Sequence, residues 1–309
     1  MQSDVRPAWR RFKGDKTMPN GAQSVQRFAD VVNGPSPDPA LPSSLVLVGA
    51  GKMGAAMLDG WLKAGLDPVD VTIVDSHPSA DIERLAAERG IALHRQPDDI
   101  TPPDVLVLAI KPQILPDAAP ALAPLVVPHT LVLSVLAGKT VSDLARYFAS
   151  THAIVRAMPN LPASIGRGIT GMVASAHVSP QQRATATSLL AGSGAVEWLD
   201  DEGLIDALSA VSGSGPAYVF YLVEVLAEAG VAAGLPADLA LRLARATVTG
   251  AGALLDASPL PANELREAVT SKGGTTAAAL AVLSGENGIS PIFIRAIAAA
   301  KRRAEELAG

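Results

Sequence analysis

The sequence predicts an α/β protein of two domains, a doubly wound parallel sheet followed by an all-α domain. Short β-branched runs alternate with helical segments up to about residue 200, which is typical of a parallel sheet with helices on both faces. Beyond that point only helical periodicity is present, punctuated by Pro, Gly and Asn. We therefore expect a disordered extension over 1–42, an α/β domain over 43–200 and a helical domain over 201–309.

The amino-acid composition excludes several classes of protein. Apolar residues make up 49% of the 309 positions and charged residues 18%, which excludes a disordered chain. A net charge of −5 without any basic block gives no sign of a nucleic-acid partner. No apolar run approaches the roughly 20 residues of a spanning helix, so no membrane is expected. The absence of cysteine excludes disulfides and thiolate metal sites, and fits a cytoplasmic location; no metal site is expected.

The first 42 residues are rich in Pro, Gly, Ser and charge and have no period, so they are predicted to be disordered. Basic residues surround Trp9, but no apolar segment follows them, which argues against a secretory signal. A flexible N-terminal extension is the favoured interpretation, and the alternative is that translation starts at Met18.

The α/β domain opens with a predicted strand over 45–48 and the turn "GAGKMG", which precedes a helix. In this G-x-G-x-x-G spacing Gly49 permits a tight turn, Gly51 lets the main chain approach a pyrophosphate, and Gly54 lets the helix lie close to the strand. Lys52 and Met53 lie in the same turn, where the helix N-terminus offers free N–H groups to phosphates. The context predicts a Rossmann domain that binds NADPH or NADH.

Polar residues follow three later strands, where a doubly wound sheet binds its ligands. Asp75 ends the second strand, where a carboxylate would bind the adenosine ribose and favour NADH; it could instead cap the next helix. Ser76 follows and could contact a phosphate. The remaining expected contacts are Ile110, Lys111 and Pro112 after "VLVLA", and Asn160 in "MPN" beside the nicotinamide.

The helical domain contains two further motifs. In "SGSGPAY", Pro216 fits a first helical turn with Ser214 as its expected N-cap. In "SKGGTT", two glycines and four hydroxyl or cationic residues precede an apolar helix expected to start near Thr276. Such a turn can fold into a nest of N–H groups that binds an anion, although a plain helix N-cap is the alternative. Densely spaced Ala and Gly predict closely packed helices and a homodimer.

The motifs "VRAMPNLPA", "SGSGPAYVF", "VTSKGGTTAAAL" and "AIKPQ", behind the glycine-rich turn, resemble those of pyrroline-5-carboxylate reductase over roughly residues 43–309. The resemblance implies reduction of 1-pyrroline-5-carboxylate to L-proline, the last step of proline biosynthesis, in a homodimer or a larger assembly such as a decamer. It implies a carboxylate-binding loop of Ser271, Gly274, Thr275 and Thr276, with Thr276 also a candidate for assisting protonation of the ring nitrogen. The chain departs from the family at Leu161, usually Thr, and at Lys272, usually Pro.

Two other functions remain open at this stage. A related two-domain enzyme could act on another cyclic imine acid or on a hydroxy acid, but hydroxy acid dehydrogenases of this build use a lysine on the first long helix of the second domain. No lysine occurs between Lys139 and Lys272, so an alcohol oxidation would lack its base. A non-catalytic dinucleotide-binding protein would need the first anion site but not the second.

Overall fold

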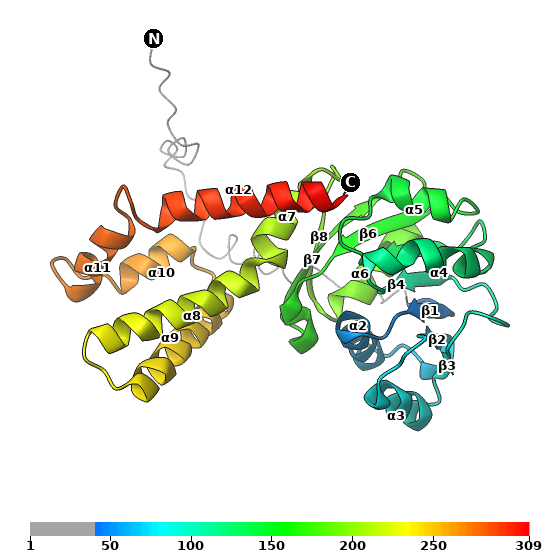
Figure 1. Cartoon of the computed structure of the whole chain (residues 1–309), viewed down its shortest axis with the longest axis horizontal. Helices are drawn as coiled ribbons and strands as arrows, with labels where there is room; N and C mark the ends of the chain where they lie inside the picture. The colour runs from blue at the N-terminus through cyan, green and yellow to red at the C-terminus, as the bar shows by residue number, and fades with distance from the viewer. Residues whose placement is uncertain (1–40, 309) are drawn as a thin grey trace, which may run out of the picture.

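The computed structural model describes residues 41–308 and consists of an α/β part and an elongated helical part. In Figure 1 the sheet and its helices occupy one end of the long axis, and helices α8 to α11 extend toward the other end. The predicted disordered extension over 1–42 lies almost wholly outside the described residues. The two-part architecture expected from the sequence is confirmed.

The α/β part is built on one eight-stranded sheet with the strand order β3-β2-β1-β4-β5-β6-β7-β8. Neighbouring strands from β3 to β6 are all parallel, as predicted. Their bounds are β1 Leu45–Val48, β2 Val71–Val74, β3 Ala92–His94, β4 Val105–Leu108, β5 Leu131–Ser134 and β6 Ile154–Met158. The carboxyl ends of the six strands therefore meet at one edge of the sheet.

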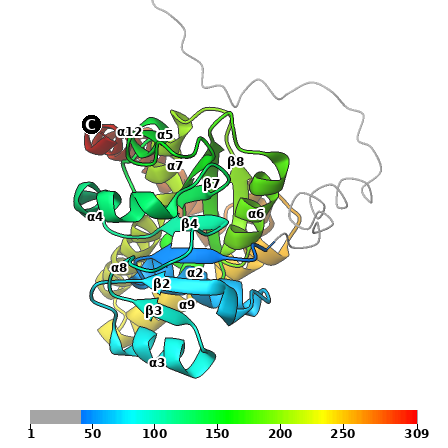
Figure 2. The same cartoon turned by 90° about the vertical axis from the view of Figure 1, so that its right-hand side faces the viewer.

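Helices cover both faces of this sheet (Figure 2). Along β1, Leu45 and Leu47 belong to one buried cluster and Val46 and Val48 to the other, because successive side chains point to opposite faces. The first cluster includes residues of α2 (Lys52–Lys63), α3 (Ala80–Arg89) and α6 (Pro180–Ala191). The second includes residues of α4 (Leu115–Leu122) and α5 (Val141–Tyr147). Two separate cores hold the strand ends in place.

Two strands were not expected from the sequence. β7 (Gly168–Ala174) pairs antiparallel with β6, and β8 (Gly194–Trp198) pairs parallel with β7. Only residues 159–167, which include the 3-10 helix η5 (Leu161–Ile165), connect β6 to β7. That connection is too short for the crossover that a parallel pair requires, so the chain reverses. The sheet is thus parallel-dominated rather than wholly parallel.

The helical part begins with α7 (Leu204–Leu208), a π-helical turn over Ser209–Gly213, and α8 (Gly215–Ala232). Ser214 holds the N-cap position of α8 and Pro216 lies in its first turn, as predicted, but Ser214 has helical dihedral angles and its side chain makes no capping hydrogen bond. The physical reason is that α7 runs through the π-turn into α8 without a break. Four more helices follow in the described chain: α9 (Ala237–Ala257), α10 (Ala262–Ala268), α11 (Thr275–Leu283) and α12 (Ile289–Ala308).

The continuous helix Leu204–Ala232 is long and apolar enough, by length and composition alone, to cross a membrane, with a mean hydropathy of 1.2 over its most apolar window. The expectation that no run reaches this length is therefore corrected. Helix α8 has no buried residue, although apolar side chains dominate it. Its packing partner in the described chain is chiefly α9, which leaves Phe220, Tyr221 and Leu222 exposed. An apolar helix of this kind needs a further surface to cover it.

Candidate active site

The glycine-rich turn after β1 leaves room for a ligand at one position only. Gly49 has φ +90°, and a Cβ there would lie 2.8 Å from Cγ2 of Ile110. A Cβ on Gly54 would collide with the carbonyl oxygen of Gly49, so this glycine lets α2 approach the strand. A Cβ on Gly51 would meet nothing within 4 Å. The open space over Gly51, at the N-terminus of α2, fits a dinucleotide pyrophosphate.

Lys52 and Met53 form the first turn of α2, and the helix has no side-chain cap at its N-cap residue Gly51. Its first N–H groups are therefore not engaged by a capping side chain within the described residues. No acidic residue lies in the first turn of α2 itself, where the positive end of the helix dipole lies. Both features favour an anionic ligand at this position.

Asp75 lies beside the turn, at the end of β2. Its Oδ2 accepts a hydrogen bond from the N–H of Ala50 at 2.8 Å, and its Oδ1 accepts one from the N–H of His77 at 2.9 Å. The carboxylate therefore ties the glycine-rich turn to the end of β2 and also caps the following turn. Each carboxylate oxygen can accept a second bond, so its role as a ribose ligand stays a prediction.

The end of β4 lies against the same turn. The N–H of Ala109 donates to the carbonyl of Val48 at 2.8 Å, and the side chain of Ile110 lies against Gly49. Lys111 is exposed and precedes Pro112, which opens the 3-10 helix Pro112–Ile114. Predicted cofactor residues from the ends of β1, β2 and β4 are thus brought together at one edge of the sheet.

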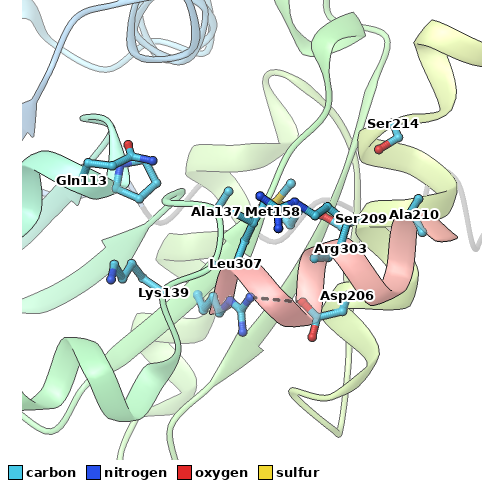
Figure 3. Close-up of a pocket in the computed structure, with 15 residues that line it drawn as sticks. Gln113, Ala137, Lys139, Met158, Asp206, Ser209, Ala210, Ser214, Arg303 and Leu307 are labelled. Carbon is cyan, nitrogen blue, oxygen red and sulfur yellow. Dashed lines mark ion pairs between the residues drawn. The ribbon is translucent and has the colours of Figure 1, made fainter. Parts of the chain in front are cut away.

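A cavity of about 670 Å³ opens beyond the ends of β4, β5 and β6 (Figure 3). One wall comes from the sheet domain and the other from α7, the π-turn and α12. The residues that line it include Pro112, Ala137, Lys139, Arg156, Met158, Asp206, Ser214 and Arg303. Its size suits part of a coenzyme, and the nicotinamide end of a dinucleotide is predicted to lie there, where the two parts of the chain meet.

A buried arginine joins these two parts. Arg156 on β6 is 5% exposed, and its guanidinium lies 2.8 Å from Oε1 of Glu202 and 3.8 Å from Oδ1 of Asp206. The same Glu202 oxygen accepts the N–H of Val141 at 2.9 Å. One carboxylate thereby holds together β6, the first turn of α5 and the entry to α7. This cluster was not predicted from the sequence, although the charged residue inside the apolar strand "IVRAM" was a usable signal.

The rim of the cavity at Lys139 is held by a capping box at the start of α5. The Thr140 hydroxyl accepts the N–H of Asp143, and the Asp143 carboxylate accepts the N–H of Thr140. Burial acts to raise the pKa of Asp143, but the hydrogen bonds from Thr140 and the charges of Arg146 and Lys139 outweigh it and hold the pKa below its ordinary value. The carboxylate stays ionised at neutral pH, which keeps the helix start and Lys139 in position.

Asn160 is engaged by the protein itself. Its amide nitrogen donates to the carbonyl of Ser212 at 3.2 Å, and its amide oxygen accepts the N–H of Ile169 at 3.0 Å. Ser212 lies in the π-turn, so Asn160 links the loop after β6 to the segment that precedes Gly215. A contact between Asn160 and the nicotinamide stays a prediction, and it would have to use the second amide hydrogen or the main chain.

The second predicted anion site has the expected local geometry. Gly273 has φ +73°, and the N–H of Gly274 donates to the carbonyl of Ser271 at 3.1 Å. Gly274 is the N-cap of α11, which starts at Thr275, and no side chain caps the helix. A Cβ on Gly274 would collide with Oγ of Ser271. The first N–H groups of α11 and the hydroxyls of Thr275 and Thr276 are thus available to an anion.

The described chain does not bring the two anion sites together. Neither Ser271 nor any of the residues 274–276 lines the cavity. Figure 1 places α11 at the end of the molecule opposite to the sheet, with α8 and α12 spanning the distance between them. The segment predicted to bind the substrate and the cleft predicted to bind the coenzyme therefore lie in separate places on one chain.

Comparison with known proteins agrees with these features. Residues 202–307 match a family model described as pyrroline-5-carboxylate reductase dimerisation, and residues 44–138 match one described as NADP oxidoreductase, coenzyme F420-dependent. Pyrroline-5-carboxylate reductase of Pseudomonas aeruginosa is 37% identical over 266 residues, covering 85% of this chain and 96% of the relative. That of Glycine max is 34% identical over 272 residues, covering 88% and 98%.

Among solved structures, a pyrroline-5-carboxylate reductase from Coxiella burnetii aligns with a TM-score of 0.80 at 32% identity, covering 86% of this chain and 98% of that one. The Plasmodium falciparum pyrroline carboxylate reductase with NADP bound has the same fold, with a TM-score of 0.72 at 24% identity. The sequence relatives match over nearly their whole length, and the motifs expected from the resemblance lie in the structural contexts described above. The chain belongs to the pyrroline-5-carboxylate reductase family.

Proposed function

We propose that the chain reduces the C=N bond of 1-pyrroline-5-carboxylate to give L-proline, with NADPH or NADH as hydride donor. The observation that carries this proposal is the pairing of two anion sites in one chain, the open turn at Gly51 and the uncapped start of α11 at Gly274. The first suits a pyrophosphate and the second a small carboxylate. The family relation then identifies the carboxylic acid.

The reaction demands little of the side chains. A bound NAD(P)H would supply a hydride to the imine carbon of the ring, and a proton would end on the ring nitrogen. Because a protonated imine is already a strong electrophile, the protein mainly has to position the two rings and exclude water. The chain has no lysine between Lys139 and Lys272 that could serve as the base of an alcohol oxidation. The residues present therefore favour imine reduction over hydroxy acid oxidation.

The site is proposed to be complete only in a dimer. The substrate loop at 271–276 lies far from the coenzyme cleft of its own chain, and α8 carries an exposed apolar surface that includes Val219, Phe220 and Leu222. A second copy that covers this surface would bring its own loop toward the first copy's cleft. Two-fold symmetry would make both sites equivalent. Assembly of such dimers into a decamer and a cytoplasmic location stay predictions.

Thr276→Ala is expected to lower kcat by about 10-fold or more while the Kd for the coenzyme is unchanged, because the hydroxyl is proposed to assist protonation of the ring nitrogen. Thr276 is half-buried in the first turn of α11, whereas the coenzyme contacts lie on the sheet. Steady-state kinetics and coenzyme titration separate the two effects. Thr276→Ser, which keeps the hydroxyl, is the matched control. An undiminished kcat in Thr276→Ala would assign the proton to water or to the substrate itself.

Lys272→Ala is expected to raise KM for pyrroline-5-carboxylate by about threefold with kcat unchanged, since an exposed charge beside a bound carboxylate contributes a fraction of a kcal/mol up to about 1 kcal/mol. The difference should shrink as salt is added, because the charge is screened. Lys272→Arg serves as the control that keeps the charge. Equal Michaelis constants for the wild type and Lys272→Ala would remove any role for this cation in substrate binding.

The direct test of the function is a spectrophotometric assay that follows oxidation of NADPH and NADH. The purified protein would be offered pyrroline-5-carboxylate and a six-membered cyclic imine acid, and, in the reverse direction with oxidised coenzyme, a hydroxy acid. We expect the highest kcat/KM with pyrroline-5-carboxylate. A higher value with the six-membered ring would identify another cyclic imine as the substrate, and hydroxy acid oxidation would reject the proposal.

A further inference from the structure

Arg95 lies next to the end of β2, near the position where the adenosine ribose of the coenzyme is expected to bind. The β2–β3 ladder continues past both strands, because the N–H of Asp75 donates to the carbonyl of His94 at 3.0 Å. This places Arg95, the next residue, beside Ser76. One guanidinium nitrogen of Arg95 donates to the carbonyl of Ser76 at 3.2 Å. Arg95 is therefore positioned at the end of the strand where a Rossmann domain holds the adenosine ribose.

The carboxylate of Asp75 is already hydrogen-bonded within the protein. Both of its oxygens already accept main-chain N–H groups, one in the glycine-rich turn and one at His77. These bonds aim the carboxylate at the protein backbone. A carboxylate that is free to face the 2′ position would repel a phosphate, whereas both oxygens of Asp75 face main-chain N–H groups. The end of β2 is thus less unfavourable for a 2′-phosphate than the sequence alone indicates.

Further donors lie beside Arg95. The hydroxyl of Ser76 is 2.9 Å from Nδ1 of His77, and both side chains are exposed. Arg95 itself is 63% exposed and uses its other terminal nitrogen in an ion pair with Glu83 at 2.8 Å. A guanidinium has five N–H donors in a planar fork that suits a phosphate, so donors remain after these two bonds. Arg95 thus contacts the main chain of Ser76, whose hydroxyl contacts the imidazole of His77, and all three side chains are exposed near the end of β2.

We propose that Arg95, together with Ser76 and His77, binds the 2′-phosphate of NADPH, so that this chain accepts NADPH in spite of the carboxylate at Asp75. Glu83 is the competing partner that holds Arg95 in place when no phosphate is bound. This inference rests on the proposed coenzyme site, because it assumes that the adenosine lies at the end of β2. It assigns specificity for the coenzyme to a residue after β3.

The test compares two nucleotides that differ only in the 2′-phosphate, adenosine 2′,5′-bisphosphate and adenosine 5′-monophosphate, in calorimetric titrations of the full-length protein. Arg95→Ala is expected to weaken binding of the bisphosphate by about 10-fold, the loss typical of a charge-assisted hydrogen bond, and to leave the monophosphate unchanged. In kinetics, KM for NADPH should rise while KM for NADH stays constant. Arg95→Lys, which keeps the charge but loses the fork, should fall between the wild type and Arg95→Ala.

Arg84→Ala is the matched control. Arg84 lies on the same helix as Glu83, is similarly exposed, and pairs with Asp81, so its loss removes the same charge without touching Ser76. An equal effect of Arg84→Ala and Arg95→Ala on the bisphosphate, or an equal loss for both nucleotides in Arg95→Ala, would overturn the proposal. Since nucleotide binding needs no turnover, an Arg95-dependent preference would stand even if the chain reduced no cyclic imine.

Discussion

Gly51→Val is expected to abolish coenzyme binding while the protein remains folded. A Cβ at this position meets nothing within 4 Å, and Gly51 has φ −67°, which any residue adopts. The protein therefore tolerates the side chain, but valine would occupy the space over the start of α2 that a pyrophosphate needs. We expect Kd for NADPH and NADH to rise on the order of 100-fold or more. Calorimetric titration measures the binding, and thermal unfolding measures the fold.

Gly54→Ala is the contrasting variant in the same motif. Its Cβ would collide with the carbonyl oxygen of Gly49, so helix and strand would have to move apart. We expect a lower Tm for this variant, in contrast to Gly51→Val, whose Tm should stay close to that of the wild type. Undiminished coenzyme binding in Gly51→Val would mean that the pyrophosphate lies elsewhere.

A heterodimer of two inactive variants is expected to regain activity. Gly51→Val would remove the coenzyme site, and Gly274→Val would impair the substrate loop, because its Cβ would displace the hydroxyl of Ser271, a predicted substrate ligand. If each active site combines one chain's sheet with its partner's loop, the mixed dimer has one site with two damaged halves and one intact site. Co-expressed chains that carry different tags, purified through both, should then show about half of the wild-type kcat per dimer.

The reciprocal heterodimer reverses the expectation. A wild-type chain paired with a chain that carries both substitutions should be inactive, because each shared site would contain one damaged half. If every site were built within a single chain, this second heterodimer would retain about half of the activity and the first would have none. The two outcomes cannot both occur, so the pair of measurements decides where the substrate loop acts.

Local features of the site could be predicted from the sequence because they depend on neighbouring residues. The turn at Gly49 and the start of α11 at Thr275, one residue from the expected position, follow from glycine spacing and an apolar helix directly behind it. Strands β1, β4 and β5 were likewise predictable, because buried parallel strands are nearly continuous apolar runs. In these segments local preference and the final fold agree.

Features that depend on distant residues were missed. β7 and β8 contain or begin with glycine, which is depleted in strands, and their pairing is decided by the short connection after β6. The bond between Arg156 and Glu202 joins residues 46 positions apart. The separation of the two anion sites depends on the directions in which α8 and α12 leave the sheet domain. None of these could be inferred from composition or period alone.

The π-helical turn at Ser209–Gly213 also constrains how relatives of this chain can diverge. It is closed by a bond from the N–H of Ser214 to the carbonyl of Ser209 at 2.9 Å, which encloses one residue more than an α-helical turn. Deleting one residue there would restore the α-helical register and rotate α8 by about 100° about its own axis. Phe220 and its neighbours would then face another direction. Length variation at this turn should therefore be far rarer than substitution, and a one-residue deletion should yield monomers.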